Sequence, residues 1–268
     1  MAAHPEGAPC WADAMFSDVE GAKSFYGDVL GWTFGESSTE FGNYTQAYVD
    51  GKAVAAVVPP MPGQEGQSAW CLYFASSDVN ATAAKVRDNG GEVLMEPMRV
   101  GEFGSMLLGR SPDGVVFGVW QPGVHKGFEA MGVPGAYVWA EIFTREPEKS
   151  DAFFPAVFSF RAKQMDHPDD PELDFRVFDR GESPLLGRMR MTDDFPPEVP
   201  SYINVYFTVS DCDDAVARAT KLGGVLRFGP MDTPFGRFAA LSDPQGASFS
   251  VIDVTTTHGE MPALTDVD

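Results

Sequence analysis

Two short segments of this chain place a tryptophan two residues before a carboxylate, a spacing that could bind or protonate a small molecule. Trp11-Ala12-Asp13 lies near the N-terminus, and Trp139-Ala140-Glu141 lies early in the second half. Alternate residues of a β-strand share a face, so each tryptophan and its carboxylate point the same way. A carboxyl group buried beside an indole ring can have a raised pKa and serve as a general acid or base. We therefore predict Asp13 and Glu141 as candidate catalytic residues.

The elements that must position these residues follow one pattern four times: a strand, a capped amphipathic helix and three further strands. The first helix begins at the capping box Ser17-Asp18-Val19-Glu20 and ends at Gly31. Proline at the first turn starts the third helix, at Glu146-Pro147. Self-similarity at this period indicates duplication. We place the modules near residues 9–62, 68–122, 135–193 and 201–254, with a polar insertion at 166–174.

Composition excludes several classes of function. The chain has 268 residues, 44% of them hydrophobic, enough for one large or two small domains. A net charge of −20 leaves no basic stripe for nucleic acid or anionic lipid. Its apolar runs are too short to span a bilayer, and the first residues do not form a secretory signal. Three cysteines fit no disulfide framework, so a cytoplasmic protein is expected.

The helix motif from Ser17 to Trp32 and the turn Ser111-Pro112-Asp113-Gly114 resemble the vicinal oxygen chelate superfamily, and the likeness covers nearly the whole chain. This superfamily includes glyoxalases, bleomycin-resistance proteins and extradiol dioxygenases, and the tandem type is similar to accessory proteins of anthracycline pathways. The resemblance implies an α+β fold: four βαβββ modules forming two tandem domains, each a cupped, mixed, eight-stranded sheet. We expect domains at residues 1–125 and 135–256, followed by a polar tail at 257–268.

In metal-dependent members of that superfamily, the ligands come from the first and last strands of each module. The matching positions here hold Trp11, Cys71, Trp139 and Asn204, then Ala55 or Ala56, Gly118, Gly187 or Arg188, and Ser250. Indole, alanine and glycine offer a divalent ion no lone pair, and a lone thiol or amide does not build a site. The four histidines, His4, His125, His167 and His258, lie outside the expected strands. We therefore expect neither a metal nor another cofactor.

The same positions could instead form an aromatic pocket. The expected ligand-binding residues are Trp11, Cys71, Tyr73, Gly118, Trp120, Trp139, Arg188, Asn204, Tyr206 and Ser250. Such walls suit a flat, largely apolar molecule oriented by a few hydrogen bonds. Packing is the competing interpretation: the tryptophans could fill space left by a lost cofactor, and Cys71 could be a small buried residue. Asp13 and Glu141 could each form a structural ion pair with an arginine such as Arg176 or Arg188.

Two functional hypotheses follow. The first is a protein, acting as a monomer or homodimer, that binds or sequesters a bulky aromatic compound such as an antibiotic or polyketide intermediate, with a pathway enzyme as a further candidate partner. The second is a lyase, isomerase or cyclase similar to members of the glyoxalase superfamily, in which Asp13 or Glu141 moves a proton, with or without a metal. An amine-bearing ligand would also suit these carboxylates and the acidic surface.

Overall fold

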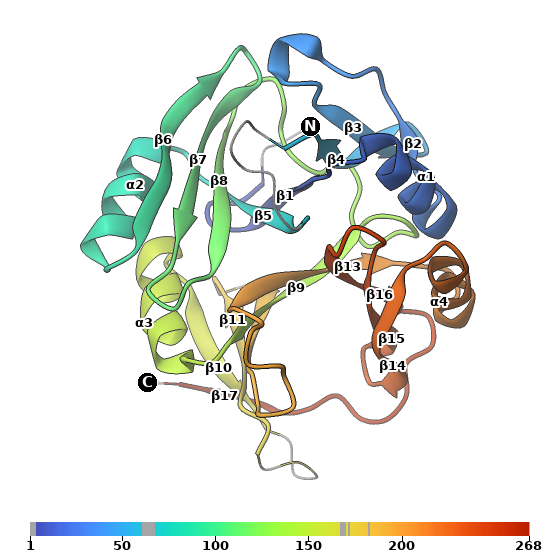
Figure 1. Cartoon of the computed structure of the whole chain (residues 1–268). Coiled ribbons are helices and arrows are strands. Elements are labelled where there is room, and N and C mark those ends of the chain that lie inside the picture. The colour runs from blue at the N-terminus through green and yellow to red at the C-terminus, as the bar shows by residue number, and fades with distance from the viewer. Residues whose placement is uncertain (1–3, 61–67, 167–169, 171, 182, 268) are drawn as a thin grey trace.

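The computed structural model describes residues 4–60, 68–166, 170, 172–181 and 183–267. Two strongly curved mixed sheets lie back to back, with helices α1 and α4 side by side at one flank and α2 and α3 at the other (Figure 1). The α+β class and the four βαβββ modules are as expected from the sequence. His167 and Asp169 of the polar insertion lie outside the described residues.

The first sheet has the strand order β2-β3-β4-β1-β5-β8-β7-β6. The two central strands, β1 and β5, pair antiparallel and begin the two modules. The elements of this domain are β1 (Pro9–Met15), α1 (Val19–Leu30), β2 (Thr33–Phe34), the 3-10 turn η1 (Thr39–Phe41), β3 (Thr45–Val49), β4 (Lys52–Val58), β5 (Trp70–Ala75), α2 (Val79–Asp88), β6 (Glu92–Val100), β7 (Gly104–Arg110) and β8 (Val116–Pro122).

The second sheet repeats this arrangement and adds one strand, in the order β14-β15-β16-β13-β9-β12-β11-β10-β17. Strands β9 and β13 take the places of β1 and β5. The elements are β9 (Tyr137–Thr144), α3 (Pro147–Phe158), β10 (Arg161–Met165), β11 (Phe175–Asp179), β12 (Pro184–Arg190), β13 (Tyr202–Thr208), α4 (Cys212–Lys221), β14 (Val225–Thr233), β15 (Gly236–Ser242), β16 (Ser248–Asp253) and β17 (Leu264–Asp266).

Helix α1 begins and ends where its sequence signals predict. The Asp18 side chain accepts a hydrogen bond from the Gly21 amide, and Gly31 ends the helix in the left-handed conformation at φ 73°. The buried residues Phe25 and Tyr26 point into the core. Helix α1 therefore covers the face of β1 that carries Ala12 and Ala14. Trp11 and Asp13 lie on the opposite face, which no helix of the described residues covers.

Polar contacts at the two proline-containing turns join the domains. Asp113, in the turn before β8, accepts hydrogen bonds from the hydroxyls of Thr144 (2.6 Å) and Ser150 (2.5 Å) in the second domain. Asp243, in the turn before β16, accepts one from the Tyr26 hydroxyl at 2.9 Å. The apolar core is also continuous between the halves. The domains are therefore locked into one body rather than linked loosely.

The C-terminal segment corrects one expectation, because part of the predicted polar tail is a strand. Leu264–Asp266 pairs antiparallel with β10, placing Leu264 opposite Met165. The preceding residues 254–263, here called the C-terminal strap, connect β16 to this far edge of the sheet. In Figure 1 the strap runs along the side of the second sheet that faces away from the first domain. None of the helices in the described residues is long and apolar enough to cross a membrane.

Candidate functional site

Strand register brings the predicted residues of the first domain together on the face free of helices. Trp11 lies opposite Tyr73, and Asp13 lies opposite Cys71. Tyr73 in turn lies beside Gly118 on β8. A β-carbon added at Gly118 would stand 2.2 Å from the Tyr73 ring, so glycine leaves the room that this ring occupies. These side chains therefore form one group around Asp13.

A chain of hydrogen bonds holds the Asp13 carboxylate. The Trp11 indole N–H donates to the Tyr44 hydroxyl at 2.6 Å, and that hydroxyl donates to Asp13 Oδ2 at 3.0 Å. Burial raises the pKa of Asp13 to about 7, while hydrogen bonds from Tyr44 and Tyr73 partly oppose the rise. Burial, together with the nearby Asp13 charge, also raises the pKa of the Cys71 thiol, which keeps it protonated and weakly nucleophilic.

The second domain repeats this group with a glutamate. Tyr206 lies opposite Trp139, and Glu141 lies between Asn204 on β13 and Gly187 on β12. The Tyr206 hydroxyl donates to Glu141 Oε2 at 2.6 Å, and the Trp139 indole donates to Oε1 at 3.2 Å. Burial raises the pKa of Glu141 to about 7, and these two hydrogen bonds limit the increase.

Asn204 and Ser250 extend this polar group. The Asn204 amide donates to the Ser250 hydroxyl at 2.7 Å, and Ser250 lies opposite Tyr206 on the parallel strand β16. Each domain thus presents a carboxyl group, a tyrosine and a tryptophan in equivalent positions. At neutral pH a carboxyl group with a pKa near 7 is present in both protonation states and can accept or donate a proton.

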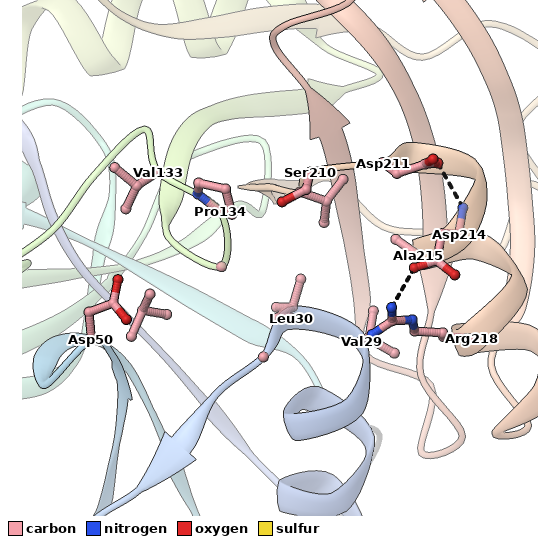
Figure 2. A pocket seen from close by; sticks show the side chains of 14 residues that line it. Val29, Leu30, Asp50, Val133, Pro134, Ser210, Asp211, Asp214, Ala215 and Arg218 are labelled. Atoms are coloured by element: carbon pink, nitrogen blue, oxygen red, sulfur yellow. Dashed lines mark hydrogen bonds and ion pairs between the residues drawn. The ribbon is translucent and has the colours of Figure 1, made fainter.

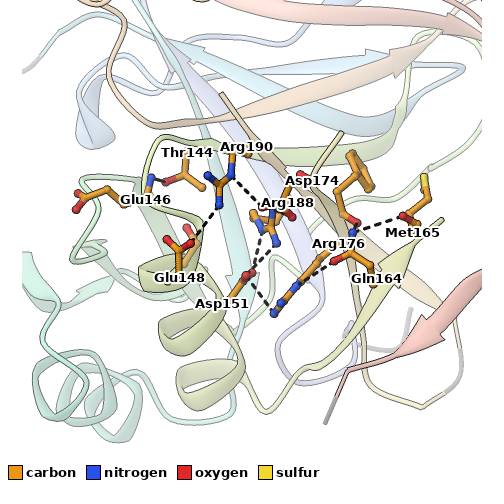
Figure 3. A network of polar contacts seen from close by, with 12 residues as sticks. Thr144, Glu146, Glu148, Asp151, Gln164, Met165, Asp174, Arg176, Arg188 and Arg190 are labelled. Atoms are coloured by element: carbon orange, nitrogen blue, oxygen red, sulfur yellow. Dashed lines mark hydrogen bonds and ion pairs between the residues drawn. The ribbon is translucent and has the colours of Figure 1, made fainter. Parts of the chain in front are cut away.

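The arginine hypothesis is wrong for both carboxyl groups. Arg188 follows Gly187 on β12, so its side chain leaves the opposite face, where it is fully buried against α3. There it forms ion pairs with Asp151 (2.9 Å) and Asp174 (2.7 Å), and Arg176 also pairs with Asp151 (3.1 Å; Figure 3). Arg188, expected to bind ligand, therefore anchors α3 to the sheet and does not reach the group around Glu141.

The two groups differ in their access to solvent. In the first domain, His125 packs edge-on against Trp11 at 4.4 Å between ring centroids, and Phe128 lies 5.6 Å from the same indole. Trp11 is 3% exposed and Asp13 is 9% exposed. The linker between the domains, residues 123–135, therefore fills the aromatic pocket expected there, and no motif in the sequence predicts this.

The second-domain group is more open. Trp139 and Glu141 are half-buried. Phe238 lies 6.1 Å from Tyr206, and Phe228 beyond it is 53% exposed. A separate small apolar cluster packs against Trp139 on the other side; it consists of Met165, Phe175, Val177, Leu173 and Met189. Trp139 and Glu141 therefore lie at the partly exposed edge of an aromatic group whose members Tyr206 and Phe175 are buried, and we call this edge the Glu141 face.

A crevice of about 390 Å³ lies between the domains, away from both groups (Figure 2). The C-terminal end of α1, the turn at Asp50, the linker at Pro134 and the start of α4 line it. Arg218 at its edge pairs with Asp214 at 2.6 Å. No residue predicted to act in binding or catalysis lines this crevice, and it is therefore not the site that the sequence indicates.

Sequence comparisons identify relatives along most of the chain. Residues 11–119 match the model of the Glyoxalase/Bleomycin resistance protein/Dioxygenase superfamily. The chain is 38% identical over 264 residues to the anthracycline biosynthesis protein DnrV of Streptomyces peucetius, covering 92% of this chain and 94% of that protein. It is 36% identical over 252 residues to CFP32 of Mycobacterium tuberculosis, provisionally named a glyoxylase, covering 92% of this chain and 95% of that one.

Solved structures confirm the fold. The Mn(II)-bound glyoxalase from Novosphingobium aromaticivorans superposes with a TM-score of 0.63 at 19% identity, covering 95% of this chain and 86% of that one. The 2,3-dioxygenase LapB from Pseudomonas sp. KL28 superposes with a TM-score of 0.66 at 13% identity, covering 97% and 96%.

Proposed function

We propose that this chain, which belongs to the glyoxalase/bleomycin resistance protein/dioxygenase superfamily, binds a planar, largely apolar aromatic molecule on the Glu141 face of its second domain. One observation carries the proposal. Of two equivalent aromatic groups, the one around Asp13 is filled by the chain's own linker, and the one around Glu141 keeps partial exposure. Aromatic walls with few polar groups favour a flat ligand held by stacking.

The residues at the superfamily's metal positions do not fit a divalent ion. Gly118 and Gly187 have no side chain to offer, and the rings of Tyr73 and Phe175 lie where a longer side chain would have to stand. No group of three or more His, Cys, Asp and Glu residues suited to a metal occurs in the described part of the chain. The proposal therefore rests on stacking and hydrogen bonding rather than on coordination.

The names of two relatives support an antibiotic or polyketide-like ligand. DnrV of Streptomyces peucetius and DauV of Streptomyces sp. (strain C5) are both named as anthracycline biosynthesis proteins. A protein that holds such a compound would serve its biosynthesis or the self-resistance of the producing cell. Both roles require saturable binding, and a purely binding protein would release its ligand chemically unchanged.

Binding can be tested with dihydroxyanthraquinone as a planar aromatic probe. We expect saturable, one-to-one quenching of protein fluorescence in the native chain and recovery of unchanged probe after denaturation. Replacing Trp139 by alanine should abolish binding, since it removes the stacking surface. Replacing the covered Trp11 by phenylalanine should preserve binding. Loss of binding in the Trp11 variant alone, or no binding by the native chain to a panel of planar aromatic compounds, would contradict the proposal.

Proton transfer by Glu141 is a second candidate function, favoured by its pKa of about 7 and its 2.6 Å hydrogen bond from Tyr206. Anthrone is a suitable probe because it is planar and has an acidic C–H flanked by two aromatic rings. The carboxylate would accept this proton and return a deuteron in heavy water. Faster deuteration of anthrone, abolished in Glu141→Gln with binding retained, would establish an enzyme. If the protein does not accelerate the deuteration, binding without catalysis is the function that remains.

A further inference from the structure

The Glu141 carboxylate has hydrogen-bond donors but no cation. Its two oxygens accept from the Tyr206 hydroxyl and the Trp139 indole, which are both neutral groups. Within the described residues, no Lys or Arg side chain forms an ion pair with it. A half-buried carboxylate in this setting gains free energy from any cation that reaches it.

The Lys and Arg side chains of strands β10 to β12 have carboxylate partners elsewhere, and Arg227 on β14 donates to the Ser242 hydroxyl. Arg188 and Arg176 lie on the helix side with Asp151, as Figure 3 shows. Lys163 and Arg161, at the β10 edge, both pair with Asp179. Since these side chains already have carboxylate partners, the charge of Glu141 is left for a ligand to neutralise.

The surroundings of Glu141 favour a cation over an anion. Trp139 and Tyr206 form a cross-strand pair next to the carboxylate and donate their polar hydrogens to it, and the negative face of a neighbouring aromatic ring attracts an ammonium group. The Glu141 charge also reaches Tyr202, whose pKa is raised to about 12 by burial and by this carboxylate. The chain as a whole carries a charge of −20, so it attracts cationic ligands and repels anionic ones at long range.

We propose that the ligand of the Glu141 face is a planar aromatic compound bearing a protonated amine, with the amine at Glu141 and the ring system against Trp139. This inference rests on the proposed binding function and specifies its ligand class. It excludes anionic substrates, because a carboxylate or a thiol conjugate carrying carboxylates would meet Glu141 without an intervening cation.

Three anthracene derivatives test the charge while keeping the ring system constant: one with an aminomethyl group, one with a hydroxymethyl group and one with a carboxylate. Binding is followed by anthracene fluorescence at about pH 8, where Glu141 is ionised and the amine is still charged. We expect the amine to bind about tenfold more tightly than the alcohol at low salt, and the carboxylate to bind least. The preference should shrink at about pH 5.5, where Glu141 is protonated.

Two variants complete the test. In Glu141→Gln the amine and the alcohol should bind within about twofold of each other, because the charge is gone while the shape is kept. Asp50→Asn removes the same charge from the crevice between the domains and should preserve the tenfold preference. Equal binding of amine and alcohol by the native chain, or a preference that persists in Glu141→Gln, overturns the ligand class while the binding function stands. Failure of all three probes to bind overturns both.

Discussion

Replacing Glu141 by glutamine is expected to remove a loss of stability that the native chain suffers as the pH rises. Burial raises the pKa of Glu141 from 4.5 to about 7, so the folded protein holds this proton more tightly than the unfolded chain. The stabilisation from this proton is fully present below pH 4.5 and is lost as the pH rises through about 7. Glutamine stays neutral throughout and lacks this dependence.

The size of the effect follows from the two pKa values. The interval from 4.5 to about 7 corresponds to at most about 3–4 kcal/mol of unfolding free energy. Glu141 is half-buried, so water screens part of this, and about 2 kcal/mol is a more realistic figure. Glutamine has a single acceptor oxygen for the two donors Trp139 and Tyr206, which costs stability equally at every pH. The difference between pH values, rather than the stability at any one of them, is therefore the informative quantity.

Urea unfolding followed by tryptophan fluorescence measures this difference. Between about pH 5 and about pH 8.5 the native chain should lose about 2 kcal/mol more unfolding free energy than the Glu141→Gln variant. Glu36→Gln, at an exposed position in the first domain, should behave like the native chain. Parallel curves for the native chain and Glu141→Gln over this range would refute the argument that Glu141 is folded into a poorly solvated, cation-free site.

Three further predictions test the architecture around the site. In Gly118→Ala the new methyl group would collide with the Tyr73 ring, and we expect a loss of about 1–3 kcal/mol in urea unfolding; an unchanged midpoint would contradict the close packing. A chain that ends after Pro262 lacks β17, and acrylamide should quench the fluorescence of its Trp139 more steeply than in the native chain. The same truncation in a chain that also lacks Trp139 should leave the acrylamide quenching unchanged. Asp113→Ala leaves the Thr144 and Ser150 hydroxyls without their acceptor at the domain junction and should lower the urea-unfolding free energy by about 2–4 kcal/mol; an unchanged unfolding free energy would contradict this.

The grouping of the site residues could be predicted from the sequence because β-structure has a strict alternation. Once Trp11 and Asp13 share a strand face, pairing with an adjacent strand brings Tyr73 and Gly118 to the same surface. The duplicated motifs then predict the same for Glu141. Local capping signals likewise set the bounds of α1. These features depend on strand alternation and helix capping, which involve residues close together in the sequence.

Other features depend on contacts between distant segments. Tyr44 reaches Asp13 from the position just before β3, two strands further along the chain, and no motif marks it. The position of Arg188 was ambiguous because a shift of one residue along β12 reverses its face, and Gly187 occupies the inward position. Strand β17 was missed because Leu264–Asp266 has three residues and little hydrophobic pattern.

Chain connectivity explains why two equivalent groups have different access. After β8 the chain must cross to β9 in the other domain, and this path draws His125 and Phe128 over Trp11. After β16 the C-terminal strap passes instead to the outer edge at β10, and Trp139 and Glu141 stay half-buried. The duplication thus supplied two carboxyl groups with raised pKa values, and the linker covers the first of them while the second stays partly exposed. A variant in which glycine replaces His125 would test this reasoning directly: if the linker ring alone covers the first group, free imidazole should bind in its place and raise the unfolding temperature of the variant but not of the native chain.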